Sequence, residues 1–186
     1  RVTKGQYQPG LVLQPFILAY AIESGLIRLN EPTAHPNRPV VVNDSATYCP
    51  SPAPEPASWQ DVMYHRCPGP MLDLGQTLSL ADLDDAFARF NLTGQPTLPL
   101  STETNTYPSL DDAAQAAIGQ DNLIVTPLQV AYAWLALNQN GRLPTLRLVS
   151  HIENELGDWV PLTLETNRLG TAVSAEQQGN PRLAEL

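Results

Sequence analysis

The stretch from residue 30 to residue 58 restricts the fold more than any other part of the sequence. Prolines recur along it and culminate in the run CPSPAPEP at residues 49–56. Proline lacks a backbone N–H donor and breaks the interior of a helix. The stretch therefore predicts a proline-rich surface excursion with at most one short strand, at residues 40–42. A loop of this length in a compact domain is usually functional or an elaboration of the fold.

Serine followed three residues later by aspartate marks the start of three predicted helices. The serines are Ser58, Ser79 and Ser109. We expect the helix after Ser58 to end at the proline-rich run of residues 67–70, and residues 72–75 to form a turn. Ser79, Ser109 and Ser174 are better explained as helix caps than as nucleophiles.

Two further helices carry broad apolar stretches. The first is predicted over residues 15–25, where apolar residues recur near helical spacing and a glycine provides the stop. The most regular helix opens at Thr126, a good N-cap, and Pro127 suits its first position. We expect its buried face to consist of five apolar residues, namely Val130, Ala131, Trp134, Leu135 and Leu137.

A β-hairpin is predicted near the end of the chain. Apolar and polar residues alternate over residues 145–152 and 159–164, on either side of a Leu-Gly-Asp turn. A weaker helix is expected from Ser174 onward. Most of the predicted elements are helices, and the predicted strands form one hairpin. The predicted fold class is therefore α+β and helix-dominated, with a helical lobe and a β-hairpin. A length of 186 residues fits a single domain over residues 1–186.

Composition and charge exclude several classes of function. A hydrophobic content of 42% with 16% charged residues indicates a packed core. The formal charge of −9 would repel a phosphate backbone, so nucleic acid is not an expected partner. We expect no transmembrane segment in this chain, because the longest apolar stretch, residues 11–29, is interrupted by polar and charged residues. The chain begins without a start methionine, and we expect that it is a piece of a longer protein.

Two cysteines, Cys49 and Cys67, flank part of the proline-rich stretch. A zinc site usually needs four ligands, and His65 is the only histidine near them. We therefore expect no metal and no cofactor. Two readings stay open: a pair of unlinked thiols, or a disulfide that closes the proline-rich loop if the protein is exported. Activation of Cys67 by His65 is disfavoured, because residues two apart point to different faces of a helix.

Three stretches, in order, resemble one known family. Residues 7–16, YQPGLVLQPF, are similar to a Y-x-P-G-S-x-x-K-P-F segment. Residues 118–131 resemble G-Q-G followed by T-P-L-Q-x-A, and residues 62–75 loosely resemble a helix with S-x-N and a later Leu-Gly. These segments are found in the transpeptidase domain of high-molecular-weight penicillin-binding proteins, which cross-link peptidoglycan. The resemblance implies a partial penicillin-binding-protein/β-lactamase-like transpeptidase fold that lacks the family's terminal sheet strands.

The same resemblance implies that the catalytic set is missing. Acyl transfer in that family needs a serine nucleophile and a lysine three residues on, which share one helix face. Here the serine position is Leu11 and the lysine position is Gln14. The S-x-N position falls at Arg66 and Pro68, without hydroxyl or amide, and no K-T-G occurs because the only lysine is Lys4. The expected set of catalytic residues is therefore empty.

The leading hypothesis is a catalytically inactive transpeptidase-like domain that acts as a structural or interaction module in the cell envelope, outside the cytoplasm. Its partner would be a protein, with the proline-rich excursion of residues 30–58 as a candidate contact surface. Two alternatives stay open: a fragment of an active peptidoglycan D,D-transpeptidase, and a module that binds stem peptide or β-lactam non-covalently. Leu11 and Gln14 weaken the last alternative because they remove a cation from the cleft. An unrelated helical domain is the remaining alternative.

Overall fold

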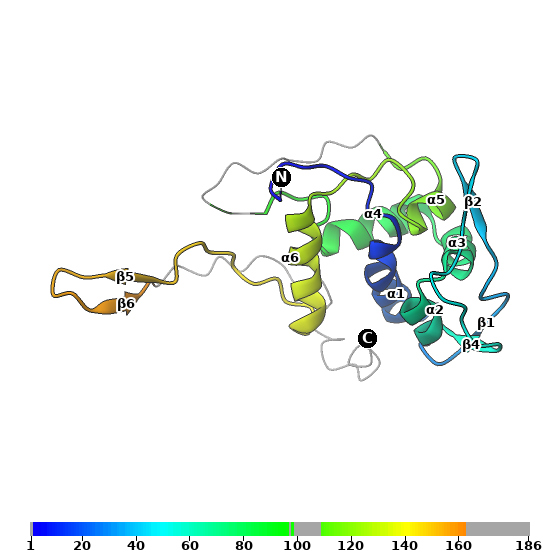
Figure 1. Cartoon of the computed structure of the whole chain (residues 1–186), viewed down its shortest axis with the longest axis horizontal. Helices are drawn as coiled ribbons and strands as arrows, with labels where there is room; N and C mark the ends of the chain where they lie inside the picture. The colour runs from blue at the N-terminus through cyan, green and yellow to red at the C-terminus, as the bar shows by residue number, and fades with distance from the viewer. Residues whose placement is uncertain (1, 97, 99–108, 163–186) are drawn as a thin grey trace.

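The computed structural model describes residues 2–96, 98 and 109–162 (Figure 1). Its helices are the 3₁₀ helix η1 (Gly10–Leu13), α1 (Gln14–Glu23), α2 (Trp59–His65), α3 (Pro68–Thr77), α4 (Leu80–Arg89), α5 (Ala113–Ala117) and α6 (Pro127–Asn138). Its strands are β1 (Pro32–Thr33), β2 (Val40–Val42), β3 (Ser45–Thr47), β4 (Ala57–Ser58), β5 (His151–Glu153) and β6 (Trp159–Pro161). The α+β, helix-dominated fold class is confirmed.

The strands form three separate antiparallel pairs: β1 with β4, β2 with β3, and β5 with β6. Figure 1 shows the helices gathered into one body, with β1 to β4 at one end. The β5–β6 hairpin projects from the opposite end, beyond α6. The predicted hairpin and its turn are confirmed, but its first strand is shorter than predicted, because residues 145–150 are not strand and β5 begins at His151. The helix expected from Ser174 falls outside the described residues. Among the described helices, none has the length and apolar character needed to cross a bilayer.

Helix α1 is the centre of the core. Eight of its ten residues are buried, so water reaches only its last turn. The ring of Phe16 on α1 lies 5.1 Å from that of Phe90 and 5.6 Å from that of Trp134 on α6. Full burial of a side chain such as Phe16 contributes about 1.5–3 kcal/mol. The body is therefore assembled around α1, which starts at Gln14.

Side-chain caps confirm three of the predicted helix starts. Ser58 with Asp61, Ser79 with Asp82, and Thr126 with Gln129 each form a reciprocal capping box. The cap predicted at Ser109 is wrong. Asp112 caps α5 instead, because its carboxylate accepts hydrogen bonds from the backbone N–H groups of Ala114 and Gln115. An aspartate adjacent to the first helical residue satisfies these donors directly.

The helix that begins after Ser58 ends just before residues 67–70, as predicted, but these residues also begin a new helix that the sequence did not predict. Arg66 ends α2 in the left-handed conformation, with φ of 52°. Cys67 is then the N-cap of α3, and Pro68 is its first residue. Proline is favoured there because the N–H it lacks would have no partner inside the helix. Residues 72–75, predicted as a turn, therefore lie within α3.

The buried face predicted for α6 is wrong for three of its five residues, whereas Val130 and Leu137 are partly buried against the core. Ala131 and Leu135 are exposed, and Trp134 is 40% exposed. The buried residues are Gln129, Tyr132, Ala133 and Ala136. Gln129 is inside although it is polar, because its amide donates to the carbonyl oxygens of Leu92 and Gly94. These partners lie far away in the sequence and rotate the helix away from its most apolar side.

The proline-rich excursion contains four short strands rather than at most one. β2 and β3 join through Asn43 and Asp44, whose φ angles of 48° and 62° suit a tight hairpin turn. The side-chain amide of Asn37 bonds both the N–H and the carbonyl oxygen of Ala53, much as a paired strand would. Hydrogen bonds from the Asn37 side chain and between the short strands thus hold the excursion together, although its prolines cannot donate backbone hydrogen bonds.

A disulfide between Cys49 and Cys67 ties this excursion to the start of α3. Of the two readings left open by the sequence, the bridged one is confirmed. The excursion also contacts α3 through Arg38, which donates to the carbonyl oxygen of Gly69 and forms an ion pair with Asp73.

Cys49→Ser should lower the free energy of unfolding on the order of 3 kcal/mol, because the 18-residue separation closes a loop in the unfolded chain. Chemical denaturation with and without a reductant measures this change. The reductant should weaken the wild type to the level of Cys49→Ser and leave that variant unaffected. Equal stability of wild type and variant would contradict the prediction.

Gly75→Ala should destabilise the protein by roughly 1–3 kcal/mol, because α3 and α5 touch at this glycine. A methyl carbon there would lie 2.6 Å from the Cβ of Ala117 and 2.7 Å from the carbonyl oxygen of Ala113. At a solvent-exposed position inside a helix, the change from glycine to alanine stabilises by roughly 1 kcal/mol. The sign of the change in stability therefore tells whether the close contact at Gly75 is present. Gln76→Ala, on the exposed side of α3, is the matched control, and denaturant midpoints provide the measurement.

Candidate functional site

The segments that carry the three sequence motifs meet in the structure. The backbone N–H of Tyr7 donates to the carbonyl oxygen of Val125 at 3.0 Å, and the reverse bond measures 2.9 Å. The N–H of Gly10 donates to the carbonyl oxygen of Gly119 at 3.0 Å. Gly119 has φ of +68°, and a Cβ there would lie 2.3 Å from the carbonyl oxygen of Gly10. Only glycine fits this contact.

The first motif enters the core through η1 and α1. Leu11 lies in η1, is half-buried and lines a cavity. Gln14 is 1% exposed, and its Nε2 donates a 3.0 Å hydrogen bond to the backbone carbonyl oxygen of Cys67. Gln14, which the resemblance aligns with the lysine, thus contacts the segment that resembles S-x-N. The leucine side chain supplies no nucleophile, and the glutamine amide is neutral.

Arg66, Cys67 and Pro68 form the other side of this contact. Arg66 is exposed and lines the cavity. Cys67 is fully buried and disulfide-bonded, so its sulfur is not a free thiol. Pro68 is buried in the first turn of α3. Of the four positions that the sequence singles out, Leu11, Gln14 and Arg66 line the same cavity, whereas Pro68 does not.

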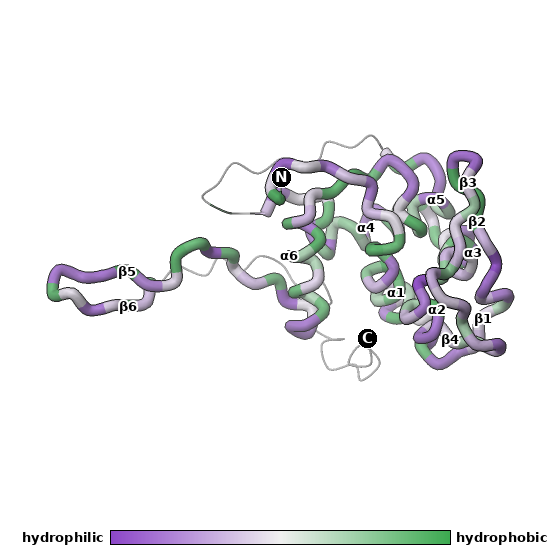
Figure 2. The backbone as a smooth tube through the Cα atoms, in the orientation of Figure 1, coloured by the Kyte–Doolittle hydropathy of each residue, from purple (hydrophilic) through white to green (hydrophobic). Residues whose placement is uncertain are grey.

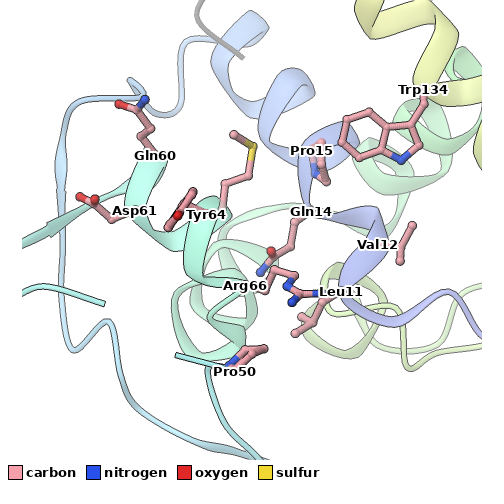
Figure 3. A pocket seen from close by; sticks show the side chains of 11 residues that line it. Leu11, Val12, Gln14, Pro15, Pro50, Gln60, Asp61, Tyr64, Arg66 and Trp134 are labelled. Atoms are coloured by element: carbon pink, nitrogen blue, oxygen red, sulfur yellow. The ribbon is translucent and has the colours of Figure 1, made fainter. Parts of the chain in front are cut away.

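The cavity has a volume of about 780 Å³ and lies between η1, α1, α2 and α6 (Figure 3). Most of its lining is apolar or aromatic, and Trp134 of α6 stands on the side opposite Tyr64 of α2. Gln14, Leu11 and Arg66 converge at the end near Pro50. The lining residues are Leu11, Val12, Gln14, Pro15, Pro50, Gln60, Asp61, Met63, Tyr64, Arg66 and Trp134.

Two charged residues lie at the cavity. The guanidinium of Arg66 has no ion-pair partner within the part of the chain that the structure describes. Asp61 accepts hydrogen bonds from the hydroxyl of Ser58 at 2.7 Å and from its backbone N–H at 2.8 Å. These bonds hold the pKa of Asp61 below its usual value. Asp61 is therefore ionised at neutral pH and is a weak base.

A serine and a histidine also meet close to the cavity. The hydroxyl of Ser51 and Nδ1 of His65 are 2.9 Å apart. Sequence reasoning missed this pair, because the residues come from the excursion and from α2. Neither residue lines the cavity, and no described carboxylate hydrogen-bonds to His65 as an orienting group. The contact therefore lacks the third member that a serine hydrolase requires.

The arrangement offers binding surface without reactive groups. Among the described lining residues there is no serine, threonine, cysteine, histidine or lysine. Within residues 2–96, 98 and 109–162, no cluster of histidine, cysteine and acidic side chains could hold a metal ion. What the cavity presents is apolar area, two aromatic rings, the carboxylate of Asp61 and the guanidinium of Arg66, which has no ion-pair partner among the described residues.

Comparison with known proteins identifies the family. The model of the penicillin-binding protein transpeptidase domain matches residues 1–181. The chain belongs to the penicillin-binding protein transpeptidase family. Comparison with curated protein sequences finds no match.

Solved structures of penicillin-binding proteins share the fold of this chain. The imipenem acyl-enzyme complex of penicillin-binding protein A from Mycobacterium tuberculosis superposes with a TM-score of 0.75 at 23% identity, over 100% of this chain and 44% of that one. The D,D-transpeptidase domain of a peptidoglycan glycosyltransferase from Eggerthella lenta gives 0.75 at 18% identity, over 100% and 48%. A peptidoglycan synthetase from Bifidobacterium adolescentis gives 0.74 at 14% identity, over 96% and 33%. This chain thus spans a third to a half of these relatives.

In this penicillin-binding protein domain, the sequence did not predict that Arg66 would line the cavity. The sequence indicated that the cleft had lost its cation when Gln14 replaced lysine. The left-handed backbone of Arg66, however, places a guanidinium at the same cavity. No local pattern signals this, because the cavity forms only when α2 packs beside η1.

Ser58→Ala should raise the pKa of Asp61 towards its usual value of about 3.8, because the hydroxyl of Ser58 is the main stabiliser of the carboxylate. The variant should also lose about 1 kcal/mol of stability through the lost cap. Since the folded-state pKa is depressed, this contribution is present above the unfolded pKa and disappears as pH falls through the folded value. NMR titration of the carboxyl carbon and denaturation at several pH values measure both effects.

Ser45→Ala, in β3, is the control for that prediction and should leave the titration of Asp61 in place. An unchanged pKa in Ser58→Ala would show that the capping bonds do not set the ionisation of Asp61.

Proposed function

We propose that this chain is a catalytically inactive transpeptidase-like domain that acts as a structural or interaction module in the peptidoglycan context of the cell envelope. The observation that carries the proposal is the contact at the first motif. Leu11 stands where the nucleophilic serine would be, and the Gln14 amide is buried against the carbonyl oxygen of Cys67. Both substitutions remove a group on which acyl transfer depends.

The contact of Gln14 also argues against a hidden cation at this point. A lysine at this position would carry a positive charge and could accept or donate a proton. A glutamine amide can do neither at neutral pH. The Nε2 of Gln14 already donates a 3.0 Å hydrogen bond to the carbonyl oxygen of Cys67. The side chain therefore has a structural role at this position. The site therefore keeps the architecture of the family while its polar interior serves packing.

The disulfide supports a place outside the cytoplasm. Bonds of this kind persist in oxidising compartments and are rare in the reducing cytosol. The bond between Cys49 and Cys67 ties the excursion to the start of α3, next to Arg66 at the cavity. We infer that the domain works in the extracytoplasmic part of the cell envelope, where it contacts a protein partner.

A specific observation favours each of the two alternatives. The chain spans 33–48% of the three solved relatives described above, so a fragment of an active D,D-transpeptidase remains a competing hypothesis. Arg66, which lines the cavity and has no ion-pair partner among the described residues, favours a module that holds stem peptide or β-lactam without a covalent bond. Only the inactive domain accounts for the leucine at position 11, which lies within the chain itself.

Incubation with a fluorescent penicillin, followed by intact-protein mass, tests the proposal. The wild type should show no mass increase, because no nucleophile lines the described cavity. The double variant Leu11→Ser/Gln14→Lys is then compared with Val12→Ser/Gln14→Lys, whose serine sits one residue along. If only the Leu11→Ser/Gln14→Lys variant takes the label, the cavity beside Leu11 and Gln14 still has the geometry that acylation needs. A mass increase of one drug molecule on the wild type would refute the proposal.

Equilibrium dialysis with unlabelled penicillin separates the binding alternative from inactivity. Retention of drug by the wild type without a mass change, and its loss in Arg66→Gln, would establish the non-covalent module.

A further inference from the structure

The β5–β6 hairpin presents apolar side chains to solvent at the far end of the molecule. Leu156 in its turn is 86% exposed, Trp159 is 69% exposed and Ile152 is 45% exposed. The hydrogen bonds that hold it are its own, such as that from the N–H of Asn154 to the carbonyl oxygen of Asp158. Figure 1 shows the hairpin standing clear of the helices. A projecting pair of strands with exposed apolar residues is typical of a contact surface.

Acidic residues surround these apolar side chains. Glu153, Glu155 and Asp158 are all exposed, and Figure 2 shows long hydrophilic stretches along the hairpin. Asn154 organises the turn, since its Oδ1 accepts from the N–H groups of Leu156 and Asp158. The turn thus holds a leucine at its tip, directly beside the carboxylate of Glu155. Its surface is apolar in the middle and negative around it.

The cavity has the complementary character. It is walled by apolar and aromatic residues, of which Tyr64 is 80% exposed and Trp134 is 40% exposed. Arg66 lines it with a guanidinium that has no ion-pair partner among the described residues, in a chain with a net charge of −9. Asp61, the other charged residue of the lining, is held by its hydrogen bonds with Ser58 at the start of α2. The cavity volume of about 780 Å³ falls within the range of roughly 300–1,000 Å³ that sites for bound groups occupy. An apolar side chain with an acidic neighbour is the group that this surface fits.

We propose that the hairpin tip of one copy docks into the cavity of a second copy, so that Leu156 enters the cavity and Glu155 meets Arg66. The proposal rests on the function proposed above, because it names the partner of the interaction module. The hairpin points away from α1 and α2, which carry the cavity walls, so it does not reach the cavity of its own copy (Figure 1). The contact joins two different surfaces and therefore propagates into rings or open chains.

Sedimentation velocity over a concentration series from about 1 μM to about 1 mM tests this association in the full chain. The wild type should show a sedimentation coefficient that rises with concentration. Leu156→Asp should weaken the association at least about tenfold, because it places a charge in the apolar cavity. Val41→Asp is the matched control, since Val41 is 65% exposed on the other hairpin, and it should behave as the wild type.

A charge exchange tests the polar half of the contact. Arg66→Glu and Glu155→Arg should each weaken the association about tenfold, and the combined variant should recover most of it. Lys4→Glu is the control for Arg66→Glu, because it makes the same change in net charge at an exposed residue outside the cavity. Circular dichroism verifies that each variant is folded.

A wild type that stays monomeric over the whole series would overturn the proposal. So would association that persists in Leu156→Asp, or a combined variant that remains as weak as its parents, because another surface would then be responsible. These results are independent of the penicillin experiment. A monomer that takes no label removes the docking proposal and leaves inactivity standing, whereas a labelled wild type removes the inactive function.

Discussion

The buried hydrogen bond from Gln14 to the carbonyl oxygen of Cys67 joins the parts of the molecule on which the rest depends. Gln14 is the first residue of α1, the centre of the core, and Cys67 is the N-cap of α3. Cys67 is also linked to the proline-rich excursion through the disulfide with Cys49. Loss of one partner would leave a buried polar group unsatisfied, at about 1–3 kcal/mol. One amide therefore couples core helix, motif segment and excursion.

The frame of the site is held by backbone contacts that do not involve reactive groups. Tyr7 pairs with Val125, and Gly10 lies against Gly119 so closely that no side chain fits between them. These contacts position η1 whichever side chains occupy its surface. The fold of the family therefore persists around Leu11 and Gln14, because these backbone contacts do not depend on the side chains at those positions.

Local rules predicted the parts of the fold that local interactions determine. The boxes at Ser58, Ser79 and Thr126 involve residues three apart, and the β5–β6 hairpin has its turn in the sequence. The failures have distant causes. The face of α6 is set by the bonds of Gln129 to residues 92 and 94, and Arg66 reaches the cavity only because α2 packs beside η1. The motif positions could be located in the sequence through the family resemblance. The cavity could not, because its walls come from helices that are far apart in the sequence.

Charge limits how any such surface can act. Two copies with a net charge of −9 repel each other at long range, and at physiological salt this repulsion is screened beyond about 8 Å. A contact between Glu155 and Arg66 works at shorter distance, where it is joined by the burial of Leu156. The apolar group would then supply most of the binding free energy and the ion pair would select the register. The acidic hairpin and Arg66, which has no ion-pair partner among the described residues, are suited to that division, because the hairpin supplies the carboxylate and the leucine while the cavity supplies the guanidinium and an apolar wall.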